Sequence, residues 1–281
     1  MIVEKIKAII KICRFNEVLL VLPYAGTASF LIAEEFPDIK KLIILLIAII
    51  TGFSAGNIFN AYADRDIDAD NPRTKDRPLV KNQLTRKEVF CLLIINVSVM
   101  VLCTYILNPV FVILLPIPAT ICFGYSLCKR FTWCGHFVLG IAHAICPVAG
   151  WLVFESYIDY RFILFGAVVF FWTFSLDMIY SSQDEEYDKE NGLYSIPVVF
   201  GKKIAFVLSI ICHVVMVVLY ILLAILMNCG NCFFVFFAID ELLLLIQYVL
   251  IFVDEGNSKY ALNINQIFAI IIFVGVVCDK F

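Results

Sequence analysis

Carboxylates recur at a spacing of four residues in two parts of this sequence. Asn60, Asp64 and Asp68 follow one another at that spacing, and so do Asp184 and Asp188. At 3.6 residues per turn, each set falls on one face of a helix, with a drift of about 40° from one residue to the next. Like charges at this spacing repel each other by a few tenths of a kcal/mol. The pattern therefore indicates that a cation neutralises them.

Magnesium fits this pattern, because it takes oxygen ligands and is usually held by one or two carboxylates together with substrate phosphates. We therefore predict that these five residues are metal ligands, and that two facing acidic stripes hold Mg²⁺ around a diphosphate. The alternative is that they are ordinary solvated helix ends. That alternative suffices for a single Asp, but two stripes in equivalent positions argue against it.

Other polar residues accompany the acidic stripes. Asp177 lies within an apolar run, seven residues before Asp184, and an acid at membrane depth is a functional candidate. Lys129 and Arg130 occupy a turn that is too short to need charge merely for solubility. Arg and Lys are natural donors to a diphosphate, so we predict that these two bind one.

The composition sets the class of protein that positions these residues. Of the 281 residues, 62% are hydrophobic and 16% are charged, whereas a soluble domain is roughly 45–50% apolar and about a quarter charged. A membrane span needs roughly 20 mostly apolar residues, and helices rather than strands fit runs of this length. We therefore predict an all-α polytopic membrane protein with nine spans, at about 15–33, 42–63, 88–107, 109–127, 136–154, 162–181, 204–227, 233–253 and 262–278.

The positive charges predict the orientation of these spans. With the N-terminus in the cytoplasm, most of the 21 Lys and Arg residues fall on the inside, and only Lys40, Lys41, Arg161 and Lys280 fall outside. Cytoplasmic loops carry such an excess. Both acidic stripes then lie at the cytoplasmic face, at the start of two long polar loops at about 64–87 and 182–203.

These two loops follow the second and the sixth span, which suggests a weak internal duplication. We predict one transmembrane domain over residues 1–281, made of two weakly repeated halves at about 15–127 and 136–253 and a final helix.

The two motifs together resemble those of the UbiA superfamily of intramembrane prenyltransferases. The family has Asn-x-x-x-Asp-x-x-x-Asp and Asp-x-x-x-Asp motifs, here Asn60–Asp68 and Asp184–Asp188. The stretches "NAYADRDIDADNPRTKDRPL", "YSLCKRFTWCGHFVLGIAHAICPVAGWLVF" and "SLDMIYSSQDEEYDKENGLYSIPVVFGKK" are similar to members that act on 4-hydroxybenzoate and related menaquinone-pathway acids. Many members have Pro-Ser-Gly or Pro-Ala-Gly after "RPL", where this chain has Val80-Lys81-Asn82.

The resemblance implies a Mg²⁺-dependent transfer of a polyprenyl group from its diphosphate to an aromatic acceptor such as 4-hydroxybenzoate or a dihydroxynaphthoate, in quinone biosynthesis. It places the enzyme in the inner (cytoplasmic) membrane, with the active site on the cytoplasmic side. It also implies roles for further residues. Asp177, Asp184 and Tyr180 are expected to act in catalysis, and Arg14, Arg77, Tyr125, Lys129 and Arg130 to bind substrate.

Other functions remain open from the sequence. A member of the same family could act on a haem, chlorophyll or lipid acceptor. A cation-coupled transporter would carry its acids near the middle of the membrane, whereas these acids lie at one face. A non-catalytic membrane scaffold gives no reason for paired carboxylates at metal spacing. We expect the partners to be a polyprenyl diphosphate, a small aromatic acceptor and the lipid bilayer, and no nucleic acid.

Overall fold

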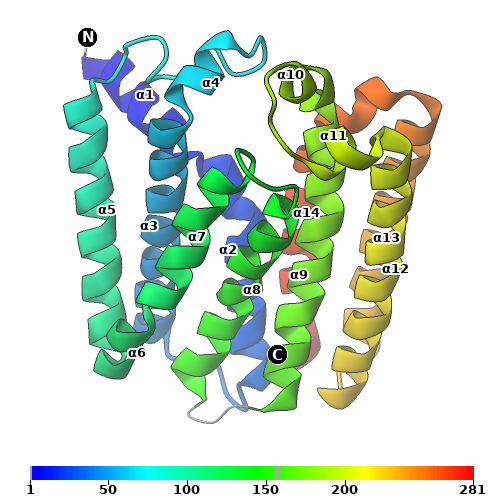
Figure 1. Cartoon of the computed structure of the whole chain (residues 1–281). Helices are drawn as coiled ribbons and strands as arrows, with labels where there is room; N and C mark the ends of the chain where they lie inside the picture. The colour runs from blue at the N-terminus through cyan, green and yellow to red at the C-terminus, as the bar shows by residue number, and fades with distance from the viewer. Residues whose placement is uncertain (1, 156–158) are drawn as a thin grey trace. The chain divides into compact units, whose positions relative to one another are not determined.

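The computed structural model describes residues 2–155 and 159–281, and no residue in these ranges lies in a strand. The chain forms two compact units. Unit 1 comprises residues 1–18 and 43–127, and unit 2 comprises residues 19–42 and 128–281. The helices of unit 1 are α1 (Ile2–Cys13), most of α3 (Ile39–Ala63), α4 (Arg65–Asp70), α5 (Arg86–Leu107), α6 (Pro109–Leu114) and α7 (Pro116–Cys128), which ends at the boundary between the units (Figure 1).

A hydrophobic cluster joins α1, α3 and α5 within unit 1. Ala8 and Ile12 of α1 pack with Ile58 of α3 and Val89 of α5. The loop after α4 enters the same cluster through Leu79 and Leu84. Thr85 then caps α5, because its hydroxyl accepts a hydrogen bond from the Glu88 amide while the Glu88 carboxylate accepts one from the Thr85 amide. This packing gives the segment between α3 and α5 a defined path.

Unit 2 is built around α9 (Tyr160–Ser181), which packs against α8 (Gly135–Phe154), α12 (Lys202–Leu226) and α14 (Ala261–Lys280). The short helices α10 (Glu185–Glu190) and α11 (Ile196–Phe200) follow the end of α9 (Figure 1). The remaining elements are α2 (Phe15–Ile32), whose first turn belongs to unit 1, and α13 (Asn231–Val253), with the 3-10 segments η1 (Ser182–Asp184) and η2 (Glu255–Tyr260).

Several polar side chains in the interior of unit 2 form hydrogen bonds with one another. The Trp172 indole donates to Asn265 at 2.8 Å, and the Asn265 amide donates to Gln247 at 2.8 Å. Ser175 and Tyr248 form a second hydrogen bond network, with 2.7 Å between their hydroxyl oxygens. Within a membrane, a polar group without a partner costs several kcal/mol, so these bonds join the helices while satisfying their polar groups.

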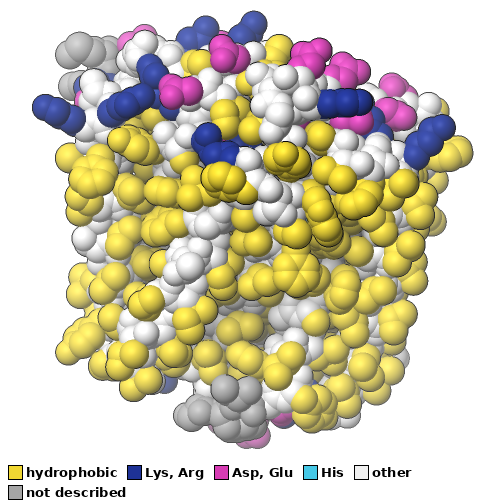
Figure 2. Space-filling view, in the orientation of Figure 1, with side chains coloured by type: hydrophobic (Ala, Val, Ile, Leu, Met, Phe, Trp, Pro, Cys, Tyr) yellow, Lys and Arg dark blue, Asp and Glu magenta, His cyan; other side chains and the backbone are white. Residues whose placement is uncertain are grey.

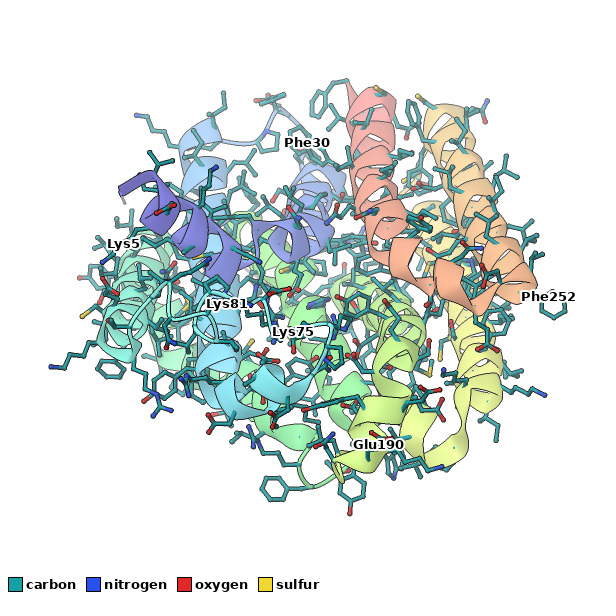
Figure 3. All side chains as sticks on the ribbon, turned by 90° about the horizontal axis from the view of Figure 1, so that it is seen from above. Lys5, Phe30, Lys75, Lys81, Glu190 and Phe252 are labelled. Atoms are coloured by element: carbon teal, nitrogen blue, oxygen red, sulfur yellow. The ribbon has the colours of Figure 1, made fainter. Side chains whose placement is uncertain are left out.

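Within the described residues, nine helices are long and apolar enough to cross a membrane. They correspond to the nine predicted spans, so the predicted all-α polytopic fold is confirmed. Large hydrophobic side chains such as Ile113, Phe252 and Val253 are exposed, and Phe252 points away from the ribbon in Figure 3. Figure 2 shows hydrophobic side chains along the flanks of the helices and charged ones gathered at helix ends.

The structure adds elements that the sequence analysis did not predict. Helix α1 precedes the first span, and the two loops predicted at about 64–87 and 182–203 contain α4, α10 and α11. The fourth predicted span is divided into α6 and α7 at Leu115, just before Pro116, because proline cannot donate the helical hydrogen bond at that point. The two compact units have different bounds from the predicted repeated halves, and the repeat stays a prediction.

Candidate active site

The first acidic motif lies where α3 passes into α4. The Asp64 amide donates to the Asn60 carbonyl and the Asp68 amide donates to the Asp64 carbonyl, each at 2.8 Å, so the four-residue helical spacing continues across the junction. Asp64 and Asp68 are 1% and 3% exposed. The Asp66 side chain, by contrast, is 85% exposed. The helical spacing therefore separates two inward-facing carboxylates from their solvated neighbours, as the sequence predicted.

Hydrogen bonds hold this first cluster in a fixed arrangement. The Asn60 amide donates to the Asp64 carboxylate at 3.0 Å, and its carbonyl oxygen accepts from Arg14 at 3.1 Å. Arg77 forms an ion pair with Asp68. Arg14 is 46 residues from Asn60 along the chain, and Arg77 is 9 residues from Asp68. The fold thus brings two predicted substrate-binding arginines to the predicted metal ligands.

Both arginines remain cationic in this setting. Burial lowers the pKa of Arg14, but Glu17 and Asp68 outweigh that effect and leave it above its usual value. Burial and the nearby Arg14 charge lower the pKa of Arg77, and Asp68 offsets part of this. An arginine stays protonated through either shift, because its pKa starts above 12. Tyr125 of α7 also lies within electrostatic range of Arg14, so it belongs to the same cluster.

Arg14 also has an unusual backbone conformation. It separates α1 from α2 with a φ of 50°, a left-handed conformation that costs a residue with a Cβ roughly 1–3 kcal/mol. Its side chain compensates by contacting both Glu17, at 3.3 Å, and Asn60. This arrangement directs the guanidinium group towards the first acidic motif.

The second acidic motif follows α9 in unit 2. Asp177 and Tyr180 lie in the last two turns of α9 and are half-buried. Asp184 ends η1, and Asp188 lies on α10. The 3-10 segment interrupts the continuous helical face that the sequence predicted, because it winds more tightly than an α-helix. The carbonyl of Asp188 accepts a hydrogen bond from the Leu193 amide at 2.8 Å, which folds the following segment back onto α10.

His136 on α8 holds Asp177 in place. Its Nδ1 lies 2.7 Å from an Asp177 carboxylate oxygen, and its Nε2 lies 3.1 Å from the Ile196 amide nitrogen. A backbone amide can only donate, so Nε2 accepts and Nδ1 carries the hydrogen that is donated to Asp177. One buried imidazole therefore joins α8, the acid on α9 and the beginning of α11.

The turn after α7 is attached to the same region of unit 2. The carbonyl of Lys129 accepts a hydrogen bond from the Tyr194 amide at 2.7 Å. Tyr194 follows Leu193, which is itself bonded to Asp188. Lys129, and Arg130 directly after it, are thereby anchored beside the segment that carries the second acidic motif.

The donor set of each motif suits magnesium. Among the residues that the structure describes, no three His, Cys, Asp or Glu side chains converge into a ready metal site. Each motif instead supplies two carboxylates, and the first adds the Asn60 amide. Two carboxylate ligands completed by substrate phosphate are the usual protein contribution to a Mg²⁺ site, so these residues fit the ion. Their assignment as metal ligands stays a prediction.

Comparison with known proteins identifies the chain. The model of the UbiA prenyltransferase family matches residues 20–271. The chain belongs to that family. It is therefore a membrane-embedded enzyme that transfers prenyl groups. A 4-hydroxybenzoate octaprenyltransferase of Francisella tularensis subsp. novicida (strain U112) is 29% identical to it over 276 residues, which is 96% of both chains.

Solved structures of UbiA homologues have the same fold. The apo structure of a homologue from Aeropyrum pernix K1 matches with a TM-score of 0.86 and 27% identity, over 95% of this chain and 99% of that one. A homologue from Archaeoglobus fulgidus, bound to GPP and Mg²⁺, matches with a TM-score of 0.74 and 19% identity, over 96% and 99% of the two chains.

One departure of this UbiA prenyltransferase from the family pattern has a structural explanation. Asn82 stands where many members have the glycine of Pro-Ser-Gly, and its φ is 54°. Asparagine is one of the few residues other than glycine that adopts this left-handed conformation readily. The backbone turn after "RPL" is thus compatible with the altered sequence, although Val80 and Lys81 change its side chains.

Sequence reasoning missed the position of His136 in this UbiA prenyltransferase. His136 and His143 lie seven residues apart on the fifth predicted span, and the sequence favours a core position for them over a place in a pocket. The structure shows that His136 bonds to Asp177 and that His143 bonds to Thr173, at 3.0 Å. The signal in the sequence was their seven-residue spacing, which allows both histidines to face one pocket.

Proposed function

We propose that this protein transfers a polyprenyl group from a polyprenyl diphosphate to an aromatic acid of the 4-hydroxybenzoate or dihydroxynaphthoate type, in quinone biosynthesis and with Mg²⁺. The observation that carries this proposal is the pair of acidic motifs, one with two buried carboxylates and the other following a histidine-held aspartate. The 4-hydroxybenzoate octaprenyltransferase relatives support the acceptor class. The GPP and Mg²⁺ bound to the Archaeoglobus fulgidus homologue support the donor class and the metal.

Asp64 and Asp68, with Asn60, and Asp184 with Asp188 would hold the metal ions. Bound Mg²⁺ would supply positive charge to the leaving diphosphate. Arg14 and Arg77, which stay charged, would bind the diphosphate oxygens alongside Lys129 and Arg130, because guanidinium groups pair with phosphate through two hydrogen bonds. This charge stabilises the diphosphate as its bond to the prenyl carbon breaks.

The same proposal gives Asp177 the role of proton acceptor. One of its carboxylate oxygens takes the hydrogen bond from His136. The other would accept the hydroxyl proton of the aromatic acceptor as a ring carbon bonds to the prenyl carbon, whose bond to the diphosphate breaks. The hydrogen on the substituted ring carbon is then lost as a proton and the ring oxygen regains one, which restores the aromatic ring. A proton acceptor must lie within hydrogen-bond reach of the proton that it removes. The hydrogen bond from His136 would therefore hold the Asp177 carboxylate in the position that proton transfer requires. The rings of Tyr125 and Tyr180 would stabilise the allylic cation through their π faces.

We further propose that the enzyme lies in the cytoplasmic membrane with its N-terminus inside and the acidic motifs on the cytoplasmic side. The distribution of Lys and Arg supports this orientation. The single-domain interpretation of residues 1–281 is part of the same proposal, and the family match over residues 20–271 supports it.

The test is product formation by the purified protein in detergent with Mg²⁺ and a labelled polyprenyl diphosphate. The acceptor panel contains 4-hydroxybenzoate, a dihydroxynaphthoate, a haem and a glycerol phosphate. We expect an aromatic acid to be prenylated, and Asp64→Asn and Asp184→Asn to lose at least 100-fold in rate. Asp66→Asn is the matched control, because Asp66 lies two residues from Asp64 but its side chain is 85% exposed. Prenylation of only the other acceptors, or full activity of both variants, would refute the proposal.

A further inference from the structure

Unit 1 has an apolar groove whose lining contains none of the residues assigned to prenyl transfer. It lies between α3 and α5, has a volume of about 110 Å³ and is open to the outside. Two of its lining residues, Tyr62 and Phe90, are substantially exposed at its edge. The full lining consists of Ile58, Phe59 and Tyr62 on α3 and Val89, Phe90 and Leu93 on α5.

The groove lies at one end of two membrane spans. The lining residues on α3 lie in the last two turns of α3, and the lining residues on α5 lie in the first two turns of α5. Its lining is hydrocarbon-like, but it ends where the chain becomes polar, at α4 and at the turn before α5. A site at this depth faces acyl chains on one side and lipid headgroups on the other.

An arginine stands next to each wall of the groove along the chain, because Arg65 begins α4 directly after α3 and Arg86 begins α5. Arg86 precedes Val89 by three residues and Leu93 by seven, which puts it on the same face of α5. Arg65 follows Tyr62 by three and Ile58 by seven, and the helical hydrogen bonds that continue through Asp64 keep this spacing. Each wall of the groove therefore continues, one turn further on, to a guanidinium group.

Both arginines reach solvent to different extents. Arg86 is exposed, and the Arg65 side chain is 31% exposed. Arg65 has a 3.2 Å contact with Asp66, whose carboxylate is itself largely in solvent, and an exposed pair of this kind contributes little stability. The adjacent Glu88 carboxylate is already bonded to Lys5 of α1, which reaches towards α5 in Figure 3. An anionic group at the groove would therefore meet two cations whose carboxylate neighbours are solvated or already paired.

We propose that this groove binds an anionic phospholipid, with one acyl chain against the apolar lining and the phosphate between Arg65 and Arg86. Arginine pairs with phosphate through two parallel hydrogen bonds, and basic residues near an anionic membrane surface attract its lipids. Acyl chains are common to all membrane phospholipids, so the selectivity for an anionic headgroup comes from the two arginines. Lipid binding at this site needs neither a metal ion nor a diphosphate.

Native mass spectrometry of the purified full chain with phosphatidylglycerol or phosphatidylcholine measures this selectivity. We expect phosphatidylglycerol to be retained roughly tenfold more strongly, and the double variant Arg65→Gln/Arg86→Gln to bind both lipids equally. Lys81→Gln is the matched control, because Lys81 is an exposed cation of the same unit that pairs with Asp76 and not with the groove. Equal retention of the two lipids by the unaltered protein would overturn the proposal.

A phosphatidylglycerol with a photoreactive acyl chain locates the site. Labelled peptides are expected from α3 and α5, and Asp64→Asn, which should abolish prenyl transfer, is expected to leave this labelling unchanged. Failure of the prenyl transfer proposal is therefore distinguishable from failure of this one. Labelling confined to other helices, or labelling displaced by a polyprenyl diphosphate at equal concentration, would show that the groove is not an anionic lipid site.

Discussion

Removal of the His136 imidazole is the sharpest perturbation of the candidate site. In His136→Ala, Asp177 loses a 2.7 Å hydrogen bond and the Ile196 amide loses its acceptor. A hydrogen bond to a charged group contributes about 1.5–3 kcal/mol, and a buried amide left without a partner costs about 1–3 kcal/mol. Because the two effects share one side chain, we expect a stability loss of about 2–4 kcal/mol rather than their full sum.

The expected fall in kcat of His136→Ala has a separate cause, because without the imidazole the Asp177 side chain can adopt other orientations. A positioned general base contributes roughly 10²–10⁴-fold to a rate, and a carboxylate that is no longer held keeps only part of that. We expect kcat to fall by about 10- to 100-fold, with the KM for the polyprenyl diphosphate unchanged, because His136 is not among the residues proposed to bind it. The assay is the initial rate of acceptor prenylation, normalised to the folded fraction of each variant.

Two conservative variants separate positioning of the acid from support of the fold. The Asn side-chain nitrogen is as many bonds from Cα as the histidine Nδ1, so His136→Asn can still donate to Asp177. The Gln side-chain oxygen is as many bonds from Cα as Nε2, so His136→Gln can still accept from Ile196. We expect kcat to be higher in His136→Asn than in His136→Gln, and stability not to follow the same order.

His143→Ala is the control for loss of an imidazole from α8, because the hydrogen bond of the His143 ring goes to the Thr173 hydroxyl. It should lose stability but keep its kcat. If His136→Gln retained the full kcat, or if kcat fell equally in His143→Ala, the orienting role of His136 would be refuted.

Three further predictions concern other parts of the molecule. Gly150→Ala should lower stability by about 1–3 kcal/mol in thermal unfolding, because a Cβ at Gly150 would overlap the carbonyl oxygen of Ala25, and an unchanged melting temperature would contradict that close contact. The hydrogen bond from Arg161 lowers the pKa of Asp159, so its stabilisation is present above the unfolded pKa of about 3.9 and is lost as the pH falls through the lower folded value. Asp159→Asn should therefore melt at a lower temperature at pH 7 and approach the unaltered protein below about pH 4, and a difference that persisted at low pH would exclude this cause. Chelation of divalent cations by EDTA should abolish prenylation and added Mg²⁺ should restore it, whereas product formed at full rate in EDTA would contradict the metal assignment.

Local periodicity made much of this protein predictable from its sequence. The nine apolar runs required membrane-spanning helices, because a backbone in lipid must satisfy its own hydrogen bonds. The four-residue spacing of Asn60, Asp64 and Asp68 predicted one shared face, and the burial of these acids beside an exposed Asp66 confirms it. Both features depend on distances of a few residues along one helix, which the 3.6-residue repeat determines whatever the rest of the chain does.

Pairings between helices were decided only by the tertiary structure. Arg14 meets Asn60 across 46 residues, and His136 meets Asp177 across 41. Which face of α8 packs on α9 depends on how the side chains of both helices interdigitate, and no local pattern encodes that. The 3-10 turn at Asp184 is likewise a result of how α9, α10 and α11 fit together. The acidic motifs themselves could therefore be found in the sequence, whereas the contacts of Arg14, Arg77 and His136 with them became visible only in the fold.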